Sequence, residues 1–229
     1  MSKLFLGSLR LVPPLIAKRA FKNCLWEGPA DCGMIALTFD DGPDPEVTPA
    51  VLDTLDAVGG RGTFFLRGDR ASQYPEVARL IGERGHVIGN HSMNHRRMLF
   101  MRRRKVLRAI DDAQAAIADA TGEAPRFFRP PYGHFSGTAG RAVRERGMVM
   151  VLWTVLAGDF EKYDPDALCE LVRPFIRPGS IIVFHDTQVG GGEMLPGVIE
   201  RVADDARKKS IRLAGIDELV EVWERERDR

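Results

Sequence analysis

The sequence has almost no net charge, few cysteines and no long uninterrupted hydrophobic run. Its 33 basic residues balance 32 acidic ones, so the overall charge gives no reason to expect nucleic acid as a partner. The three cysteines, Cys24, Cys32 and Cys169, are too few for the disulfide framework of a small secreted protein. The spacing of Cys24 and Cys32 also matches no common zinc motif. We therefore expect reduced thiols, and a globular protein whose function lies in a local site.

The N-terminal segment, residues 1–26, is apolar but repeatedly interrupted by charges and prolines. No stretch of it reaches the length of about 20 apolar residues that a transmembrane helix needs. It also lacks the unbroken apolar stretch and the small-residue cleavage site of a secretory signal. We therefore expect a cytoplasmic protein. Residues 1–33 are predicted to form an extension that precedes or packs on a single domain, residues 34–229.

Short β-rich runs alternate with amphipathic stretches along that domain. Such an alternation predicts a parallel sheet covered by helices, either open or closed. Seven strands with crossovers throughout favour an α/β barrel, one strand short of the usual eight. The predicted strands are residues 34–39, 62–66, 86–89, 126–128, 148–153, 180–184 and 211–215. The predicted helices are residues 45–59, 75–85, 104–122, 136–147, 164–176 and 194–210.

Polar side chains, most of them ionisable, follow five of these predicted strands. In either architecture the carboxyl ends of parallel strands meet at one edge, which is where ligands bind. We therefore expect these side chains to gather at one site. They are Asp40 and Asp41, Asn90 and His91, Arg129, Asp159, and His185.

The segment "HSMNH" places His91 and His95 four residues apart, so that on a helical turn both imidazoles would share one face. With one carboxylate from "TFDDGP" they would leave a fourth position open on a tetrahedral zinc, as catalytic sites do. The other aspartate would accept a proton from the attacking water. The spacing does not decide which of Asp40 and Asp41 is the ligand. The alternatives are a histidine pair without a metal and a turn whose aspartates cap the next helix.

Two further segments carry candidate groups. In "RFFRPPYG", Arg129 is a suitable charge partner for a buried carboxylate, and the two prolines stiffen a loop whose backbone N–H could face an oxyanion. His185, at the end of an apolar run, is a candidate general acid, and Asp159 is the carboxylate that would raise its pKa. The alternatives are a solvated arginine in a rigid turn and a satisfied core histidine.

The segments "TFDDGP", "HSMNH", "RPPYG", Trp153 to Asp159 and "IIVFHD" resemble, in this order, the five motifs of the polysaccharide deacetylase family, carbohydrate esterase family 4, which carries the NodB homology domain. The resemblance runs from about residue 34 to about residue 217. It implies a distorted (β/α)7 barrel that removes N-acetyl groups from amino sugars with one divalent cation. Zn²⁺ is the expected cation, and Co²⁺, Ni²⁺ and Mn²⁺ are alternatives.

The resemblance also implies a role for each matching residue. It makes Asp40 the general base, with Arg129 orienting it, and His185 the acid, with Asp159 tuning it. The ligands would be Asp41, His91 and His95, the oxyanion donor the backbone N–H of Tyr132, and the substrate contacts Trp153, Val183 and Pro131. The chain departs from the family at Leu156, Phe160 and Val183, where relatives commonly carry an acid, a tryptophan and a leucine.

The substrate implied is an N-acetylated amino sugar or polysaccharide, such as peptidoglycan, a chitin oligomer or a lipid-linked aminosugar. Alternatives are an O-acetyl esterase, a carbohydrate-binding relative without catalysis, and a phosphatase with a strand-end aspartate, which leaves the histidines unexplained. The basic and apolar segment "RRMLFMRRRK", residues 96–105, and residues 1–26 suggest contact with an anionic membrane. The competing interpretation of 96–105 is a solvated basic helix start.

Overall fold

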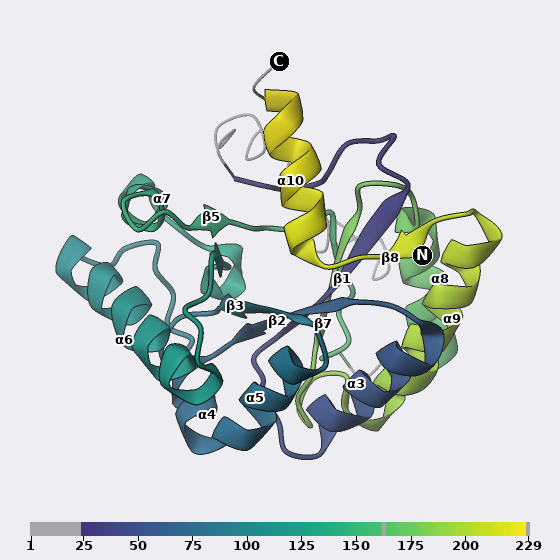
Figure 1. Ribbon diagram of the computed structural model, residues 1–229, viewed down its shortest axis with the longest axis horizontal. Helices are drawn as coiled ribbons and strands as arrows, with labels where there is room; N and C mark the ends of the chain where they lie inside the picture. Colours follow the sequence, from purple (N-terminus) through teal and green to yellow (C-terminus); the bar gives the residue numbers. More distant parts are fainter. Residues whose placement is uncertain (1–23, 162–163, 228–229) are drawn as a thin grey trace.

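Parallel strands form one curled sheet at the centre of the molecule (Figure 1). A computed structural model of the chain describes residues 24–161 and 164–227. In these residues the strand order is β5-β4-β3-β2-β1-β7-β6, with β8 pairing beside the start of β1. The strands are β1 (Met34–Asp40), β2 (Gly62–Leu66), β3 (Val87–Asn90), β4 (Phe127–Phe128), β5 (Val149–Met150), β6 (Val155–Leu156), β7 (Ile181–His185) and β8 (Arg212–Leu213).

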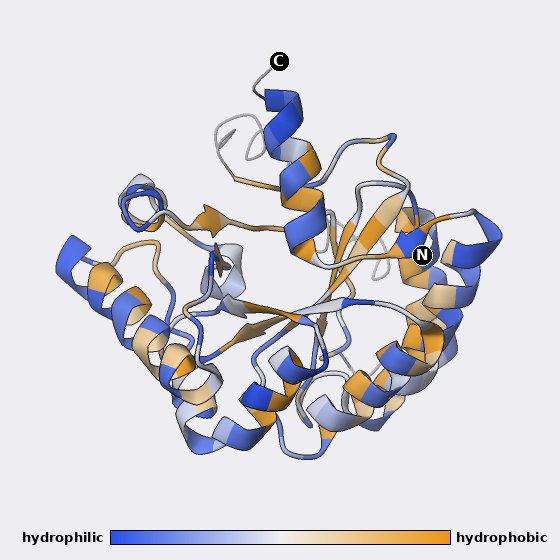
Figure 2. Ribbon diagram, viewed as in Figure 1, coloured by the Kyte–Doolittle hydropathy of each residue, from blue (hydrophilic) through white to orange (hydrophobic). Residues whose placement is uncertain are grey.

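Helices cover the outside of this sheet, as Figure 1 shows for α3 to α6, α8 and α9. Figure 2 shows that the strands are mainly hydrophobic, whereas the helices mix hydrophilic and hydrophobic residues. The helices are α3 (Val47–Val58), α4 (Gly68–Gln73), α5 (Pro75–Glu83), α6 (Arg103–Thr121), α7 (Gly137–Arg144), α8 (Pro165–Val172), α9 (Leu195–Lys208) and α10 (Ile216–Arg227). The short 3₁₀ helices are η1 (Pro131–Gly133), η2 (Arg173–Phe175) and η3 (Gly192–Met194). None of the described helices is long and apolar enough to cross a bilayer.

The predicted distorted (β/α)7 barrel is confirmed, and the distortion is a gap between the two ends of the sheet. Strands β5 and β6 do not pair with each other in the described part of the chain. Residues 24–28 run beside this gap: Leu25 forms a parallel bridge to Val151, and the N–H of Gly28 donates to the carbonyl oxygen of Gly179 (2.7 Å). Residues 24–28, which precede the first strand, thus bridge the barrel at this gap.

The core explains why β1 is buried along its whole length. A parallel strand with helices on one side and barrel interior on the other is apolar on both faces. Phe39 stacks on Phe64 of β2, with ring centroids 4.8 Å apart, in the cluster between sheet and helices. Ala36 of the same strand belongs to the interior cluster with Leu25 and Phe65. Strand β1 is therefore a rigid support for the residues that follow it.

Part of the segment proposed to touch a membrane is not free to do so. Cys24, Leu25 and Trp26 are buried, so the proposal for residues 1–26 is wrong for these three; residues 1–23 lie outside the described residues. The three cysteines are free thiols. The pKa of Cys24 is raised to about 11, mainly by burial, so this thiol is inert near neutral pH.

The structure contains elements that the sequence pattern did not predict. Strand β6 has only two residues and depends on its pairing with β7, and α4 has only six residues. Helix α10 carried a readable signal, because its buried residues Ile216, Leu219 and Val220 follow helical spacing. The predicted strand 148–153 is also shorter than expected: β5 covers two of its residues.

Candidate active site

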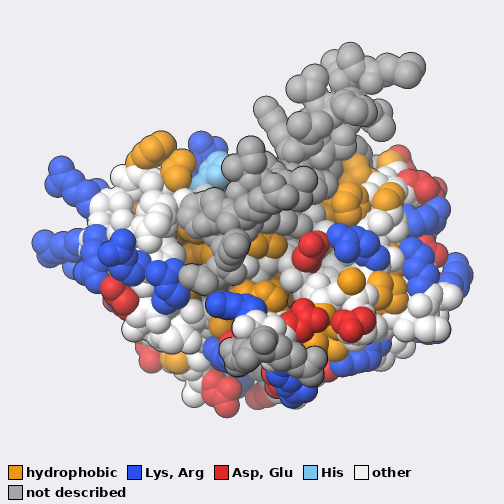
Figure 3. All heavy atoms as spheres, turned by 90° about the horizontal axis from the view of Figure 1, so that it is seen from above, with side chains coloured by type: hydrophobic (Ala, Val, Ile, Leu, Met, Phe, Trp, Pro, Cys, Tyr) orange, Lys and Arg blue, Asp and Glu red, His pale blue; other side chains and the backbone are white. Residues whose placement is uncertain are grey.

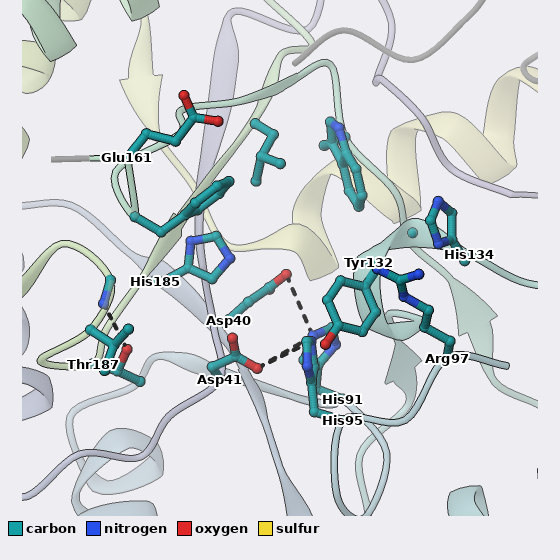
Figure 4. Close-up of a pocket in the computed structure, with 16 residues that line it drawn as sticks. Asp40, Asp41, His91, His95, Arg97, Tyr132, His134, Glu161, His185 and Thr187 are labelled. Atoms are coloured by element: carbon teal, nitrogen blue, oxygen red, sulfur yellow. Dashed lines mark hydrogen bonds and ion pairs between the residues drawn. The ribbon is translucent and has the colours of Figure 1, made fainter. Parts of the chain in front are cut away.

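A cavity of about 760 Å³ opens at the carboxyl ends of β1, β3 and β7. Figure 4 shows two aspartates and two histidines meeting near its centre, with His185 on one side and Tyr132 on the other. The lining residues are Asp40, Asp41, His91, His95, Arg97, Tyr132, Gly133, His134, Trp153, Leu156, Phe160, Glu161, His185, Thr187, Val189 and Gly190. Seven residues predicted from sequence are among them: Asp40, Asp41, His91, His95, Tyr132, Trp153 and His185.

The pairing register explains why residues far apart in sequence meet here. Asp40 is the last residue of β1 and pairs with His185, the last residue of β7. On the other side, Asn90 at the end of β3 pairs with Phe128 at the end of β4, so the next residues, His91 and Arg129, are also neighbours. The parallel sheet therefore brings polar side chains from the ends of four strands to one edge.

Three side chains form a cluster suited to a cation: the ligand atoms of Asp41, His91 and His95 all lie within 4.8 Å of one another. The Nε2 atom of His95 is 3.3 Å from Asp41 Oδ1, and that of His91 is 3.9 Å from it. Asp41 Oδ1 is buried and has no hydrogen-bond partner. A buried carboxylate oxygen is normally satisfied, so this oxygen fits a cation.

The imidazole of His91 is oriented by a hydrogen bond at Nδ1, the ring nitrogen that does not face the cluster. Its Nδ1 lies 2.8 Å from the carbonyl oxygen of Arg129, so Nδ1 carries the proton and Nε2 offers its lone pair to the cluster. Burial lowers the pKa of His91 to about 3 and also lowers the pKa of His95. Both rings are thus neutral near pH 7, which is the form that binds metal. One carboxylate and two imidazoles suit zinc and its first-row neighbours.

The interpretation of "HSMNH" as a helical turn is wrong. Residues 91–95 form a loop, in which Ser92 and His95 have φ angles of 67° and 52°. The rings converge nonetheless, with centroids 5.0 Å apart. The loop is fixed by backbone contacts, because the N–H of Gly68 donates to Ser92 and the N–H of Met93 donates to Ala109 of α6 (both 3.0 Å). Tertiary contacts replace the helix that the spacing suggested.

Asp40 lies beside the cluster and is held by a buried arginine. Arg129 Nη1 donates to Asp40 Oδ1 (2.7 Å) and to Thr38 Oγ1 (2.8 Å), and Nη2 donates to the carbonyl oxygen of Leu152 (3.0 Å). The guanidinium also lies 4.0 Å from the centroid of the Phe65 ring. Asp40 Oδ2 remains free of Arg129 and lies 3.8 Å from His91 Nε2. One oxygen of Asp40 is therefore fixed and the other faces the cavity.

His185 lies opposite and is held by Asp159. Its Nδ1 is 2.8 Å from Asp159 Oδ1, and its backbone N–H donates to Asp159 Oδ2 (2.6 Å). Burial opposes the imidazolium charge, but the hydrogen bond and the charge of Asp159 outweigh it and raise the pKa of His185 to about 9. His185 is therefore protonated near neutral pH and can donate a proton from Nε2.

The predicted oxyanion donor and substrate contacts divide into two groups. Tyr132 and Trp153 line the cavity, and Gly133 lets the backbone approach the Trp153 ring closely, because a Cβ at its φ of 64° would lie 2.3 Å from that ring. Pro131 and Val183 are buried and are not among the lining residues. Leu156, which pairs with Val183, lines the cavity in its place.

Sequence reasoning missed Asp186, which supports the "TFDDGP" turn from below. Thr48 Oγ1 donates to its Oδ2 (2.5 Å), and a Cβ on Gly42 would lie 2.4 Å from the same oxygen. Gly42 is thus needed for close packing of the turn on Asp186. Burial raises the pKa of Asp186 to about 8, so this carboxyl is neutral at pH 7. Its place directly after His185 in sequence was the available signal.

The rim of the cavity carries further residues that the sequence did not single out, above all Arg97, His134 and Glu161. Figure 4 shows Arg97 beside Tyr132, and its guanidinium lies 4.8 Å from the centroid of that ring. His95 lies on the same ring, with centroids 4.4 Å apart. Tyr132 thus links the cluster of Asp41, His91 and His95 to the rim.

Comparisons with known proteins agree with this geometry. The family model described as polysaccharide deacetylase matches residues 27–151. A peptidoglycan-N-acetylglucosamine deacetylase of Bacillus cereus is 30% identical over 85% of this chain and 70% of its own length. A chitooligosaccharide deacetylase of Sinorhizobium fredii is 39% identical over 66% of this chain and 71% of its own.

A solved structure is similar as well. A crystal structure of a peptidoglycan N-acetylglucosamine deacetylase, in complex with 4-naphthalen-1-yl-N-oxidanyl-benzamide, superposes with a TM-score of 0.85 at 29% sequence identity. The superposition covers 89% of this chain and 95% of that one. Fold and site thus define an α/β barrel with polar side chains gathered in a cavity at the carboxyl ends of its strands. The chain belongs to the polysaccharide deacetylase family, also called carbohydrate esterase family 4.

Proposed function

We propose that this protein is a divalent-metal-dependent N-deacetylase that removes acetyl groups from an N-acetylated amino sugar. The observation that carries the proposal is the orphaned Oδ1 of Asp41 facing two neutral imidazoles, with Asp40 and His185 on either side of the same cavity. A cation held by Asp41, His91 and His95 would polarise the acetyl carbonyl and lower the pKa of a coordinated water.

The other residues supply the proton transfers. The free oxygen of Asp40 accepts the proton of the attacking water, while Arg129 holds the carboxylate in place. His185, protonated because of Asp159, donates its proton to the departing nitrogen. The products are acetate and a free amine.

The protonated state of His185 favours an amide over an ester. An amide nitrogen leaves poorly as an anion and needs a proton, whereas an alcohol leaves more easily without one. An O-acetyl esterase would therefore depend less on the contact of His185 with Asp159. A relative without catalysis is disfavoured, since Asp40 and His185 line the same cavity as the cluster of Asp41, His91 and His95. A phosphatase leaves the histidine cluster without a role.

The substrate class is proposed from the relatives, which are named for peptidoglycan N-acetylglucosamine and for chitooligosaccharides. Leu156 and Phe160 line the cavity in positions where the resemblance implies an acid and a tryptophan. The sugar contacts on this side are therefore more apolar than the family pattern. A lipid-linked aminosugar and a cytoplasmic location stay predictions.

The test measures acetate release from N-acetylglucosamine oligomers and from peptidoglycan after chelation and after re-addition of Zn²⁺, Co²⁺, Ni²⁺ or Mn²⁺. We expect chelation to abolish activity and one of these ions to restore it. The variant His95→Gln should lower metal content and activity together. Full activity in metal-free protein would contradict the proposal, and so would inactivity of the metal-loaded protein on every acetylated sugar tested.

A further inference from the structure

An apolar turn lies in a strongly basic segment that also contains Arg97, a residue of the cavity lining. The N–H of Met101 donates to the carbonyl oxygen of Met98 (3.3 Å), so residues 98–101 form a β-turn with Leu99 and Phe100 at its corners. Turn corners usually carry Gly, Pro, Asn, Asp or Ser. The side chain of Phe100 is 94% exposed and that of Leu99 is 40% exposed. Two exposed large apolar residues at the corners of this turn point to a contact.

The turn is anchored rather than loose. Met98 is fully buried in the cluster formed by α6, α7 and β5, and Met101 packs against the same cluster. These two methionines fix both ends of the turn on the body of the protein. Leu99 and Phe100 are thereby forced outward, and we call them the apolar tip.

Cations surround the apolar tip on both sides along the chain. Residues 96–105 contain six exposed basic residues and no acid. In the described part of the chain, only one of the six forms an ion pair: Arg103 contacts Glu145 (2.8 Å). Four of the six stand at the start of α6, where the helix dipole favours acids and where the first turn has none. Figure 3 shows Lys and Arg side chains gathered at the left, the end at which α6 and α7 lie in Figure 1.

The apolar tip is close in sequence to the cavity lining, which has exposed apolar side chains of its own. Arg97, two residues before Leu99, lines the cavity. Among the described residues, five large apolar side chains are exposed: Leu99, Phe100, Tyr132, Phe160 and Val189. The last three line the cavity itself. Three of these five side chains therefore line the cavity, and the other two follow Arg97 of its lining within three residues.

We propose that residues 96–105 dock the protein on an anionic lipid membrane, with the apolar tip inserted among the headgroups and the cavity facing the membrane surface. Two apolar side chains are too little surface for a stable protein interface, which buries about 800 Å² on each partner. The combination of a few inserted apolar groups and several cations is what reversible membrane binding requires. A soluble polyanion would explain the cations but not the apolar tip.

The proposal predicts that the whole protein cosediments with vesicles containing phosphatidylglycerol at low salt. Binding should be absent with phosphatidylcholine alone and should fall steeply at about 0.5 M salt, where the Debye length is only a few ångströms. Vesicle binding requires no turnover, so it can succeed or fail independently of the deacetylase activity.

Two variants separate the charge from the apolar tip. Replacing Arg102, Arg104 and Lys105 by Gln should weaken binding by about 100-fold, since each cation near the membrane contributes about a factor of five. Phe100→Ser should weaken it by about tenfold or more. The matched control replaces Arg207, Lys208 and Lys209, at the end of α9, by Gln. This control should bind as the wild type does, and all three proteins should release acetate from a soluble oligomer at the wild-type rate.

A tryptophan at the apolar tip reports insertion directly. In Phe100→Trp, the emission added to that of the three native tryptophans should shift to the blue and be shielded from a water-soluble quencher when anionic vesicles are present. Absence of vesicle binding at low salt, or binding that Phe100→Ser leaves unchanged, overturns the proposal. Equal binding to a soluble polyanion such as heparin, with no blue shift on vesicles, overturns it as well.

Discussion

The floor and the rim of the cavity are built in opposite ways. On the floor, Asp40, Arg129, His91 and Asp159 are almost completely buried and each has a defined polar partner. On the rim, Tyr132, Phe160 and Val189 are exposed. Burial strengthens electrostatic interactions and fixes geometry, so the floor is suited to proton transfer and charge stabilisation. The rim can vary without disturbing it and is suited to substrate choice.

One carboxylate in each region separates the chemistry of the floor from that of the rim. Asp40→Asn removes the proposed base and should lower kcat by about 10²- to 10⁴-fold, whereas Glu161→Gln on the rim should change it by less than about tenfold. Acetate release by the two variants gives the ratio. Metal content should stay at the wild-type level in both, because neither residue belongs to the ligand cluster. Similar losses in both variants would remove the distinction between floor and rim.

A buried and an exposed arginine test how much an ion pair contributes to the unfolding free energy in each environment. Arg129→Met leaves the carboxylate of Asp40 without its partner in a dry environment, and should cost about 3–5 kcal/mol of unfolding free energy. Arg103→Met breaks an exposed ion pair with Glu145 and should cost less than about 1 kcal/mol. Denaturant unfolding of both variants measures the difference. Equal stabilities would show that the floor does not depend on this pair.

His185 should make the stability of the metal-free protein depend on pH. Its pKa of about 9 lies above the unfolded value of 6.5, so the imidazolium contact with Asp159 is fully stabilising below pH 6.5 and is lost as the pH rises through 9. The difference corresponds to about 3 kcal/mol. Denaturant unfolding between pH 6 and pH 10, compared with Asp159→Asn, isolates this contribution because Asp186 titrates in both proteins. Parallel pH profiles for wild type and variant would refute the assignment.

The smallest effect is expected on the rim. Phe160 is half exposed and its ring contacts His185 edge-on, with centroids 5.3 Å apart. Phe160→Ala should raise KM for an oligosaccharide by about fivefold and leave kcat within about twofold, since a stacking contact binds substrate and transition state alike. A fall in kcat as large as that expected for Asp40→Asn would show that Phe160 acts in the chemical step and not only in substrate binding.

The sequence was a good guide where the chemistry follows strand ends. Asp40, His91, Arg129 and His185 each come directly at the end of a strand or after it, and parallel strands bring their carboxyl ends together whatever the loops do. This rule depends only on local patterns, so it could be applied without the structure. The loop carrying His91 and His95 was misread as helical, because its shape depends on contacts with Gly68 and Ala109 that no local pattern encodes.

The residues that line the cavity were harder to predict from sequence than the residues at strand ends. Val183 and Pro131 stand in the predicted motifs but are buried behind the cavity wall, while Arg97 and Glu161 line it without belonging to a motif. The residues that line a cavity depend on the path of loops over the surface, and loop paths follow from long-range packing rather than from periodicity. Asp186 was missed for a related reason, since its partners Gly42 and Thr48 are more than 130 residues away.

By itself, the sequence determined the class of fold, the family and the set of candidate site residues, because these depend on residue type, order and strand-end position. Only the tertiary structure decided that Asp41 Oδ1 is left without a hydrogen-bond partner and that His91 presents Nε2 to the cluster. It also decided that Leu99 and Phe100 face outward between two anchored methionines. Exposure and satisfied hydrogen bonds are properties of long-range packing, and the chain acquires them only when it folds.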